Sequence, residues 1–280
     1  VGVKALYLNT TAVANTALGW NAAYSNTTGA SNVAIGYQSL ASNTTASNNV
    51  AVGYQAGYSF TTGGYSTVMG YQAAQNATAG GTVAIGHSSA KNNTGAGITA
   101  VGSNALVTNT SGTSSTGIGT NALNDNTTGG YNVALGRNAL YSNTTANNNT
   151  AVGYAALNLN TTGTQNVALG QSAASSTTTG GQNTAVGTNA LNSNTTASNN
   201  TAVGYQAGYT NTTGSYNTFV GRQAGYLANN TGNVFNAFFG QSAGYSCTTG
   251  YNNTYIGTNA GDLITTGHDN TILGRYNGNA

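Results

Sequence analysis

A short alternation of apolar and polar positions returns along the whole chain, each time closed by a glycine. These anchor glycines are Gly2, Gly19, Gly36, Gly53, Gly70, Gly86, Gly102, Gly119, Gly136, Gly153, Gly170, Gly187, Gly204, Gly221, Gly240, Gly257 and Gly274. Thirteen of the sixteen spacings are seventeen residues, two are sixteen and one is nineteen. A fixed period of this length predicts a repeat architecture in which each unit packs on its two neighbours.

The residues before each anchor glycine predict short β-strands. An aliphatic or other apolar residue directly precedes the glycine, and Val or Thr usually stands two positions earlier, on the same face of a strand. We therefore expect an all-β fold, a parallel β-solenoid with about 17 residues per coil and about 16 coils, forming a single array over residues 1–280. The residues expected to form its core are Val33, Ile35, Val50, Val52, Val133, Leu135, Val203 and Val220.

Between these two positions lies a residue on the opposite strand face, and it is usually Ala rather than a polar residue. Strands that are apolar on both faces are usually covered on both faces. A stripe of small residues would let partner chains approach closely. The predicted interface stripe consists of Ala34, Ala51, Ala134, Ala151, Ala168, Ala185 and Ala202.

Asn recurs four residues before the anchor glycine. In a solenoid, equivalent residues stack at about 4.8 Å, so amide side chains can hydrogen-bond along the column. The predicted Asn ladder comprises Asn32, Asn49, Asn132, Asn149, Asn166, Asn183, Asn200 and Asn217.

The composition of the chain excludes several classes of function and structure. Charged residues make up 3% of the chain and the net charge is +2, which is too little for the basic surface that nucleic-acid binding requires. The single cysteine, Cys247, excludes an intrachain disulfide framework. No apolar run is long enough to cross a membrane, so we expect no membrane insertion of this segment. The array begins and ends within a repeat, from which we expect it to be a window of a longer fibre protein.

The segments "SNVAIGYQS" (31–39), "NNVAVGYQA" (48–56), "YNVALGRNA" (131–139) and "QNVALGQSA" (165–173) carry a resemblance. They resemble the YadA-like head repeats of trimeric autotransporter adhesins, and are similar to repeat arrays of phage tail fibres and bacterial surface fibres. The resemblance implies a left-handed parallel β-roll, three rolls packed side by side, and inward-pointing Val and Ile. The period of seventeen is longer than the adhesin repeat, and the extra length falls in the "NTTG" loops.

These loops, at 26–29, 43–46, 126–129, 143–146, 160–163, 194–197 and 211–214, are expected to form an exposed ridge. Turn chemistry explains Asn, Thr and Gly there. Two alternatives remain open: glycan attachment at Asn-x-Thr, and an ice-binding Thr array, although adjacent threonines point apart.

Tyrosines form two recurrent sets, which either stack on sugars or partners or shield the edges of a thin core. One set follows the anchor and the other lies four residues further on: Tyr37, Tyr54, Tyr71, Tyr154 and Tyr205; Tyr58, Tyr141, Tyr209, Tyr226 and Tyr245.

The chain has few residues of the ionisable types that enzymes use for catalysis. Asp262, His268 and Asp269 are the only close group of ionisable residues, and we interpret them as solvated loop residues. We expect no enzyme, no catalytic or metal site and no cofactor.

The sequence thus predicts a non-catalytic structural region of an extracellular fibre, either a phage tail fibre or a bacterial surface adhesin or appendage, serving as rigid shaft or adhesive head. The expected partner is the chain itself, in a homotrimer or higher fibre assembly, with a host-surface glycan or protein as a further candidate. The alternative is a monomeric ice-binding or glycan-binding β-solenoid.

Overall fold

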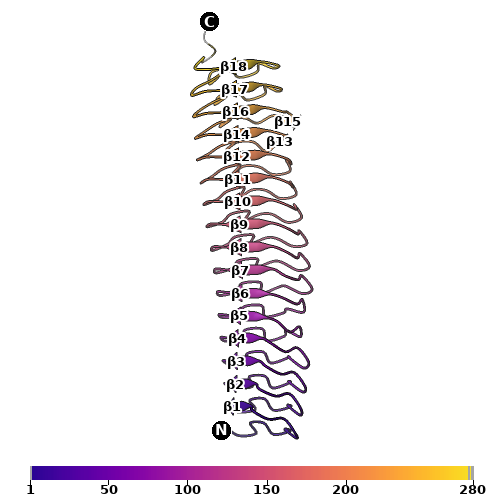
Figure 1. Cartoon of the computed structure of the whole chain (residues 1–280). Helices are drawn as coiled ribbons and strands as arrows, with labels where there is room; N and C mark the ends of the chain where they lie inside the picture. Colours follow the sequence, from indigo (N-terminus) through magenta and orange to yellow (C-terminus); the bar gives the residue numbers. More distant parts are fainter. Residues whose placement is uncertain (1, 277, 279–280) are drawn as a thin grey trace. The chain divides into compact units, whose positions relative to one another are not determined.

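The computed structural model describes residues 2–276 and 278, and within them the chain is a parallel β-solenoid with about 17 residues per turn and no helix (Figure 1). The chain divides into two compact units, residues 2–138 with 143–145, and residues 139–142 with 146–276 and 278. The predicted all-β solenoid is therefore confirmed, whereas handedness, trimer formation and a single array over 1–280 stay predictions.

Each coil contributes one three-residue strand, and successive strands pair in parallel with equivalent residues aligned. In the first unit, for example, Ala34 pairs with Ala51, and in the second Ala168 pairs with Ala185. The strands of the first unit are β1 (Thr16–Leu18), β2 (Val33–Ile35), β3 (Val50–Val52), β4 (Thr67–Met69), β5 (Val83–Ile85), β6 (Thr99–Val101), β7 (Thr116–Ile118) and β8 (Val133–Leu135).

The second unit continues the same pattern and adds a small side sheet. Its main strands are β9 (Thr150–Val152), β10 (Val167–Leu169), β11 (Thr184–Val186), β12 (Thr201–Val203), β14 (Thr218–Val220), β16 (Ala237–Phe239), β17 (Thr254–Ile256) and β18 (Thr271–Leu273). The side sheet pairs β13 (Thr213–Ser215) with β15 (Thr231–Asn233).

The anchor glycine is required by both backbone conformation and space. Gly53 has a φ of 137°, a region that residues with a Cβ rarely adopt, and a Cβ there would lie 2.3 Å from the carbonyl oxygen of Gly70. Gly170 shows the same geometry, with a φ of 133° and a Cβ position 2.6 Å from the carbonyl carbon of Gly187. Consecutive coils therefore approach through bare backbone where each strand ends.

After the glycine the chain turns through left-handed residues that are not glycine. Gln38 and Leu40 have φ values of 52° and 50°, and the equivalent residues of most coils repeat them. Such conformations cost about 1–2 kcal/mol per residue. Burial of Leu40, and hydrogen bonds between neighbouring coils such as Gln55 Nε2 to Gln38 Oε1 at 2.8 Å, offset that cost.

The two faces of each strand are reversed relative to the sequence prediction. The middle residue of the strand points into the coil, so Ala34, Ala51, Ala134, Ala151, Ala168, Ala185 and Ala202 are all 0% exposed. These alanines are core, and their prediction as an interface stripe was wrong. The residues predicted as core lie on the outer face, where each is half-buried or exposed: Val33, Ile35, Val50, Val52, Val133, Leu135, Val203 and Val220.

The reason for the reversal is the narrow interior of a seventeen-residue coil. The buried alanine of each strand shares that interior with Ala or Ser three residues past the anchor and with the residue four past it, often Leu. Buried Asn side chains occupy the remaining space. A second medium aliphatic residue in every strand would overfill such a core.

Bulky core residues occur where a neighbouring position loses its side chain. Phe219, Phe238 and Tyr255 replace the usual alanine, and Gly225, Gly244 and Gly261 stand six residues after them in place of Leu or Ala. A Cβ on Gly225 would lie 2.4 Å from the Phe219 ring. The change in residue size near the C-terminal end is thus a volume exchange within the same core.

The irregular spacings are absorbed in loops and leave the main strands in register. The two sixteen-residue coils still pair Val68 with Ala84 and Ala84 with Ala100. The nineteen-residue coil still pairs Phe219 with Phe238, and part of its longer loop forms β15 (Figure 1).

Candidate functional surfaces

The outer face of the main strands is an aliphatic surface. In the first unit Leu18 and Met69 are 51% and 42% exposed, and in the second Val167 and Leu169 are 41% and 47% exposed. The third residue of every main strand is apolar, and the first residue, which shares its face, is Val in some strands, such as β2 and β10, and Thr in most of the others. We call the surface formed in each unit by the third residues of the main strands, together with the valines at the first position, the aliphatic face.

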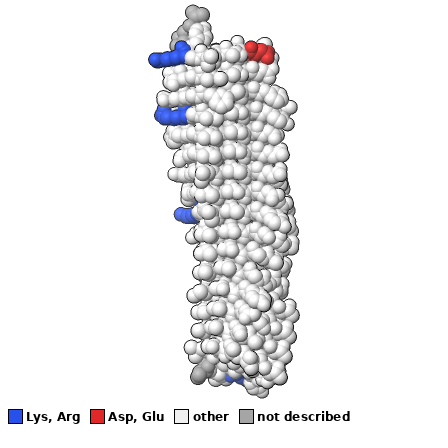
Figure 2. All heavy atoms as spheres, viewed as in Figure 1, with Lys and Arg blue, Asp and Glu red and all other residues white. Residues whose placement is uncertain are grey.

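Charge is sparse on the molecular surface. Figure 2 shows one side of the protein, on which Lys, Arg and acidic residues appear only at isolated places. Uncharged aliphatic columns without interspersed charges are typical of surfaces that associate.

The predicted Asn ladder is present in both units, with a pairing that differs from the expected one. The Oδ1 atom of Asn32 accepts a hydrogen bond from the backbone N–H of Asn49 at 3.0 Å, and Asn166 and Asn183 repeat this arrangement at 3.0 Å. The Nδ2 atom of Asn32 donates to the carbonyl of Ala46 at 2.9 Å, in the loop that closes the next coil. Both the oxygen and the nitrogen of such an amide therefore bond to the backbone of the following coil. The ladder was expected to consist of bonds between amide side chains.

A second Asn column lies at the first position of the "NTTG" loops. Asn43 Nδ2 donates to Asn26 Oδ1 at 2.7 Å, and Asn126 Nδ2 donates to Asn109 Oδ1 at 2.6 Å. The Asn residues of all seven loops are 0% exposed: Asn26, Asn43, Asn126, Asn143, Asn160, Asn194 and Asn211. Their amides are part of the core, so the folded loops do not present them as glycan acceptors. In the sequence, only the repetition of Asn at the first loop position indicates this second column.

The two threonines of each loop differ. The Thr27 hydroxyl donates to the carbonyl of Thr44 at 3.0 Å, whereas Thr28 is exposed. The equivalent exposed threonines are Thr11, Thr45, Thr62, Thr128 and Thr145 in the first unit and Thr162, Thr179, Thr196, Thr249 and Thr266 in the second. The loops consequently present one file of threonines and not two.

Six of the predicted tyrosines form face-to-face stacks, whereas the other four stack on no ring of the described residues: Tyr58, Tyr141, Tyr154 and Tyr205. Trp20, Tyr37, Tyr54, Tyr71 and His87 follow one another with centroid distances of 4.8, 5.1, 5.1 and 5.3 Å. In the second unit Tyr209, Tyr226 and Tyr245 stack at 5.2 and 5.0 Å. Because neighbouring rings cover both faces of the internal members, these columns favour edge shielding over sugar stacking.

The candidate ionisable group is only partly brought together. His268 Nδ1 lies 2.8 Å from Asp269 Oδ2, with both side chains exposed. The hydrogen bonds from His268 and Asn252 lower the pKa of Asp269. Asp262 lies in a different hollow, with Asn259, Arg275 and Tyr276. In the described part of the chain no three His, Cys, Asp or Glu residues are grouped to hold a metal ion.

Cys247 replaces an Asn of the loop column and is fully buried. Its thiol donates to the carbonyl of Gly250 at 3.7 Å, and burial raises its pKa to about 11. The thiolate is the reactive form, so this residue has the character of a structural thiol.

We expect the Cys247 thiol of the folded protein to react with a disulfide reagent at pH 8 more than about 100-fold slower than a free thiol. The measurement is the rate of release of the coloured thiolate, before and after unfolding in guanidinium. The variant Thr196→Cys in a Cys247→Ser background, with its thiol at an exposed position, should react at the free rate. Rapid labelling of the native Cys247 would contradict the buried assignment.

No helix in residues 2–276 is long and apolar enough to span a membrane. Comparisons of the chain with protein-family models, with curated proteins and with solved structures give no match, so the evidence for its function is the geometry of its own surfaces.

Proposed function

We propose that this array is a non-catalytic structural region of an extracellular fibre, acting as a rigid shaft or adhesive head in which three copies pack side by side. The observation that carries the proposal is the aliphatic face. Val, Ile, Leu and Met side chains such as Leu169 are about half exposed in a chain with 3% charged residues. Their burial against other copies would supply about 25 cal/mol per Å² of apolar surface removed from water.

The internal structure suits a mechanical role. Successive coils are joined by strand pairing and by hydrogen bonds of the Asn columns, and part of each unit also has stacked rings, so force along the stack is shared by repeated contacts. The resemblance to YadA-like head repeats supports the same assembly, with one amendment. The Val and Ile positions point out of their own coil, and in a trimer they would point toward the other two chains.

The proposal is tested by the solution mass of residues 1–280, measured by light scattering after size exclusion. We expect a mass near three times 27.8 kDa. Lys substitutions at Val152, Leu169 and Val186, which lie at the third position of three successive strands, should give a monomer with unchanged circular dichroism. Lys at the exposed Thr162, Thr179 and Thr196 of the same unit is the matched control and should leave the trimer intact.

A stable monomer of the unsubstituted chain would overturn the trimer and favour the second candidate, a monomeric ice-binding or glycan-binding solenoid. The observation that supports this candidate is the file of exposed threonines, for example Thr162, Thr179 and Thr196. Inhibition of ice recrystallisation by the monomer, lost on the three Lys substitutions in that file, would establish its ice-binding form.

A further inference from the structure

The longest coil of the second unit leaves a hollow between two loops. Two extra residues lie between Gly221 and Gly240, and β15 uses this length to pair with β13 of the preceding coil. Within the described residues no backbone hydrogen bond joins Thr231–Asn233 to residues 249–251 of the following coil. The loops that elsewhere lie in contact are parted here.

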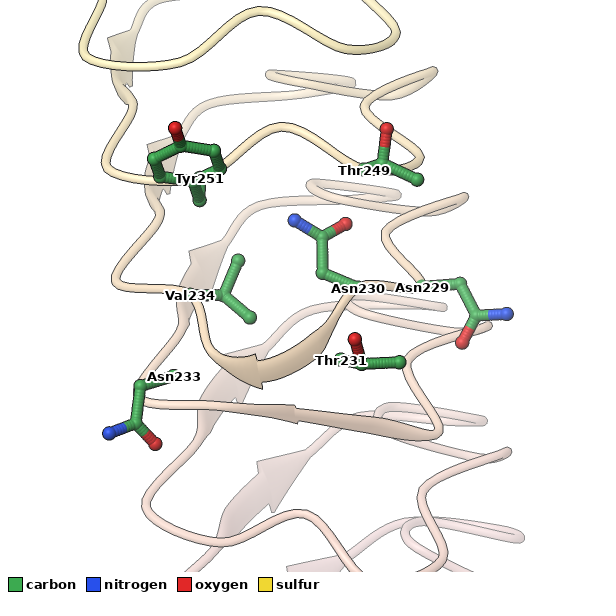
Figure 3. A pocket seen from close by; sticks show the side chains of 7 residues that line it. All are labelled: Asn229, Asn230, Thr231, Asn233, Val234, Thr249 and Tyr251. Carbon is green, nitrogen blue, oxygen red and sulfur yellow. The ribbon is translucent and has the colours of Figure 1, made fainter.

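The parted loops enclose a cavity of about 310 Å³, open to solvent. This volume lies at the lower end of the range for small-molecule sites. Figure 3 shows its surroundings, with Val234 and Tyr251 on one side and Thr249 on the other; the residues that line the cavity are Asn229, Asn230, Thr231, Asn233, Val234, Thr249 and Tyr251. None of them is charged.

Asn230 lines the cavity, but its side chain is buried. The residue is 7% exposed, and its Nδ2 donates to the carbonyl of Gly250, which fixes the orientation of the amide. Its Oδ1 is buried and has no hydrogen-bond partner in the described chain. The Oδ1 atoms of Asn194 and Asn211 in the same loop column also lack a partner, so this feature is not special to the longest coil. The polar groups that the cavity offers to a ligand are those of the exposed Asn229, Thr231, Asn233 and Thr249, which can accept hydrogen bonds from hydroxyl groups.

Tyr251 gives the cavity an apolar wall. One face of its ring stacks on His268 with centroids 4.8 Å apart and planes at 5°. Among the described residues its other face has no ring against it, and Val234, the residue seventeen positions earlier, lines the same cavity (Figure 3). Tyr251 therefore differs from the internal members of the tyrosine columns, because it retains a ring face for a ligand.

We propose that this cavity binds one residue of an uncharged sugar. A pyranose ring presents hydroxyl groups on its rim and a C–H face, which match the exposed threonine and asparagine side chains and the Tyr251 ring. The absence of charge from the lining selects against acidic and phosphorylated ligands. The small volume admits one ring, with neighbouring sugar residues left in solvent.

The site is compatible with the proposed assembly and does not depend on it. Figure 1 places β13 and β15 to the side of the main strands of the second unit, at the loops. The aliphatic face belongs to β14 and β16 instead. Packing of copies through the main strands would consequently leave the cavity accessible.

The test is saturation-transfer NMR of the 280-residue protein with methyl glycosides of glucose, galactose, mannose and N-acetylglucosamine, each at about 20 mM. We expect transfer to at least one of them, with a Kd of about 1–10 mM for so small a contact. Tyr251→Leu and Asn233→Ala, which both change exposed lining residues, should each reduce the signal at least about tenfold.

Two controls make the result decisive. Tyr131→Leu removes an exposed tyrosine of the first unit and should leave the signal unchanged. Circular dichroism should show that both cavity variants remain folded. Absence of transfer to all four glycosides, or equal transfer to Tyr251→Leu and the unsubstituted protein, would overturn the sugar site. Light scattering on the same samples reports separately on the trimer, so failure of one proposal is distinguishable from failure of the other.

Discussion

Replacement of Gly102 by alanine should open the coils around it, with a loss of more than about 4 kcal/mol in local stability. The residue has a φ of 130°, and a Cβ would lie 2.6 Å from the carbonyl oxygen and 2.7 Å from the carbonyl carbon of Gly119. Both are backbone atoms of the next coil, so relief requires the coils to separate and their ladder hydrogen bonds to break. Hydrogen exchange followed by mass spectrometry measures the opening free energy of peptides from residues 85–120.

The matched control is Gly97→Ala, in the same coil region of the first unit. Gly97 also has a positive φ, of 70°, but the nearest atom to its Cβ would be Ser114 Oγ at 3.6 Å. The expected loss is about 1–2 kcal/mol, the cost of a left-handed alanine alone. Similar losses for the two variants would show that the close approach of anchor glycines is not what fixes the coil spacing.

The second large effect concerns the volume exchange at Phe219. Phe219→Ala should cost about 3–5 kcal/mol, because it leaves a cavity beside Gly225 and Gly208. Gly225→Leu should also destabilise, since a Cβ at this position already lies 2.4 Å from the Phe219 ring. The double variant recreates the pair formed by Ala185 and Leu191, both fully buried, and should be more stable than either single variant.

The backbone permits this exchange. Gly225 has a φ of 60°, and Leu191, at the equivalent position, adopts 48°. Chemical denaturation of the four proteins, read as a double-mutant cycle, should give a coupling energy of about 2–3 kcal/mol. Ala185→Phe alone is the control and should destabilise, because Leu191 occupies the space that a ring would need. Additive effects in the cycle would contradict the volume exchange.

Periodicity was sufficient to predict the class of fold. The recurrence of Gly36, Gly53 and their equivalents set the coil length, and the alternation at Val33–Ile35 set the strands, because both signals are local. The Asn column at Asn32 and Asn49 was also predictable, since identical residues at one spacing must stack in a solenoid.

The inner and outer faces were not predictable from hydrophobicity alone. Ile35 is more apolar than Ala34, yet Ala34 is the buried residue. The coil length limits the volume of the interior. The sequence feature that indicates the buried positions is therefore the complementary size of two residues six positions apart: small Ala34 with large Leu40, and large Phe219 with Gly225. The cavity beside Asn230 could be suspected from the nineteen-residue spacing, but its open side depends on the pairing of β15 with β13.

The two Asn columns give the stack a direction. In each column the Oδ1 atom accepts from the coil that follows: Asn32 from the N–H of Asn49, and Asn26 from the Nδ2 of Asn43. A completed coil therefore offers a row of oriented acceptors on its C-terminal side. During synthesis the N-terminal coils leave the ribosome first, and each provides a template on which the next seventeen residues can settle before the remainder of the chain exists. The order of translation and the polarity of the side-chain amides agree, so the arrangement suits growth of the fold from a finished edge toward the newest residues.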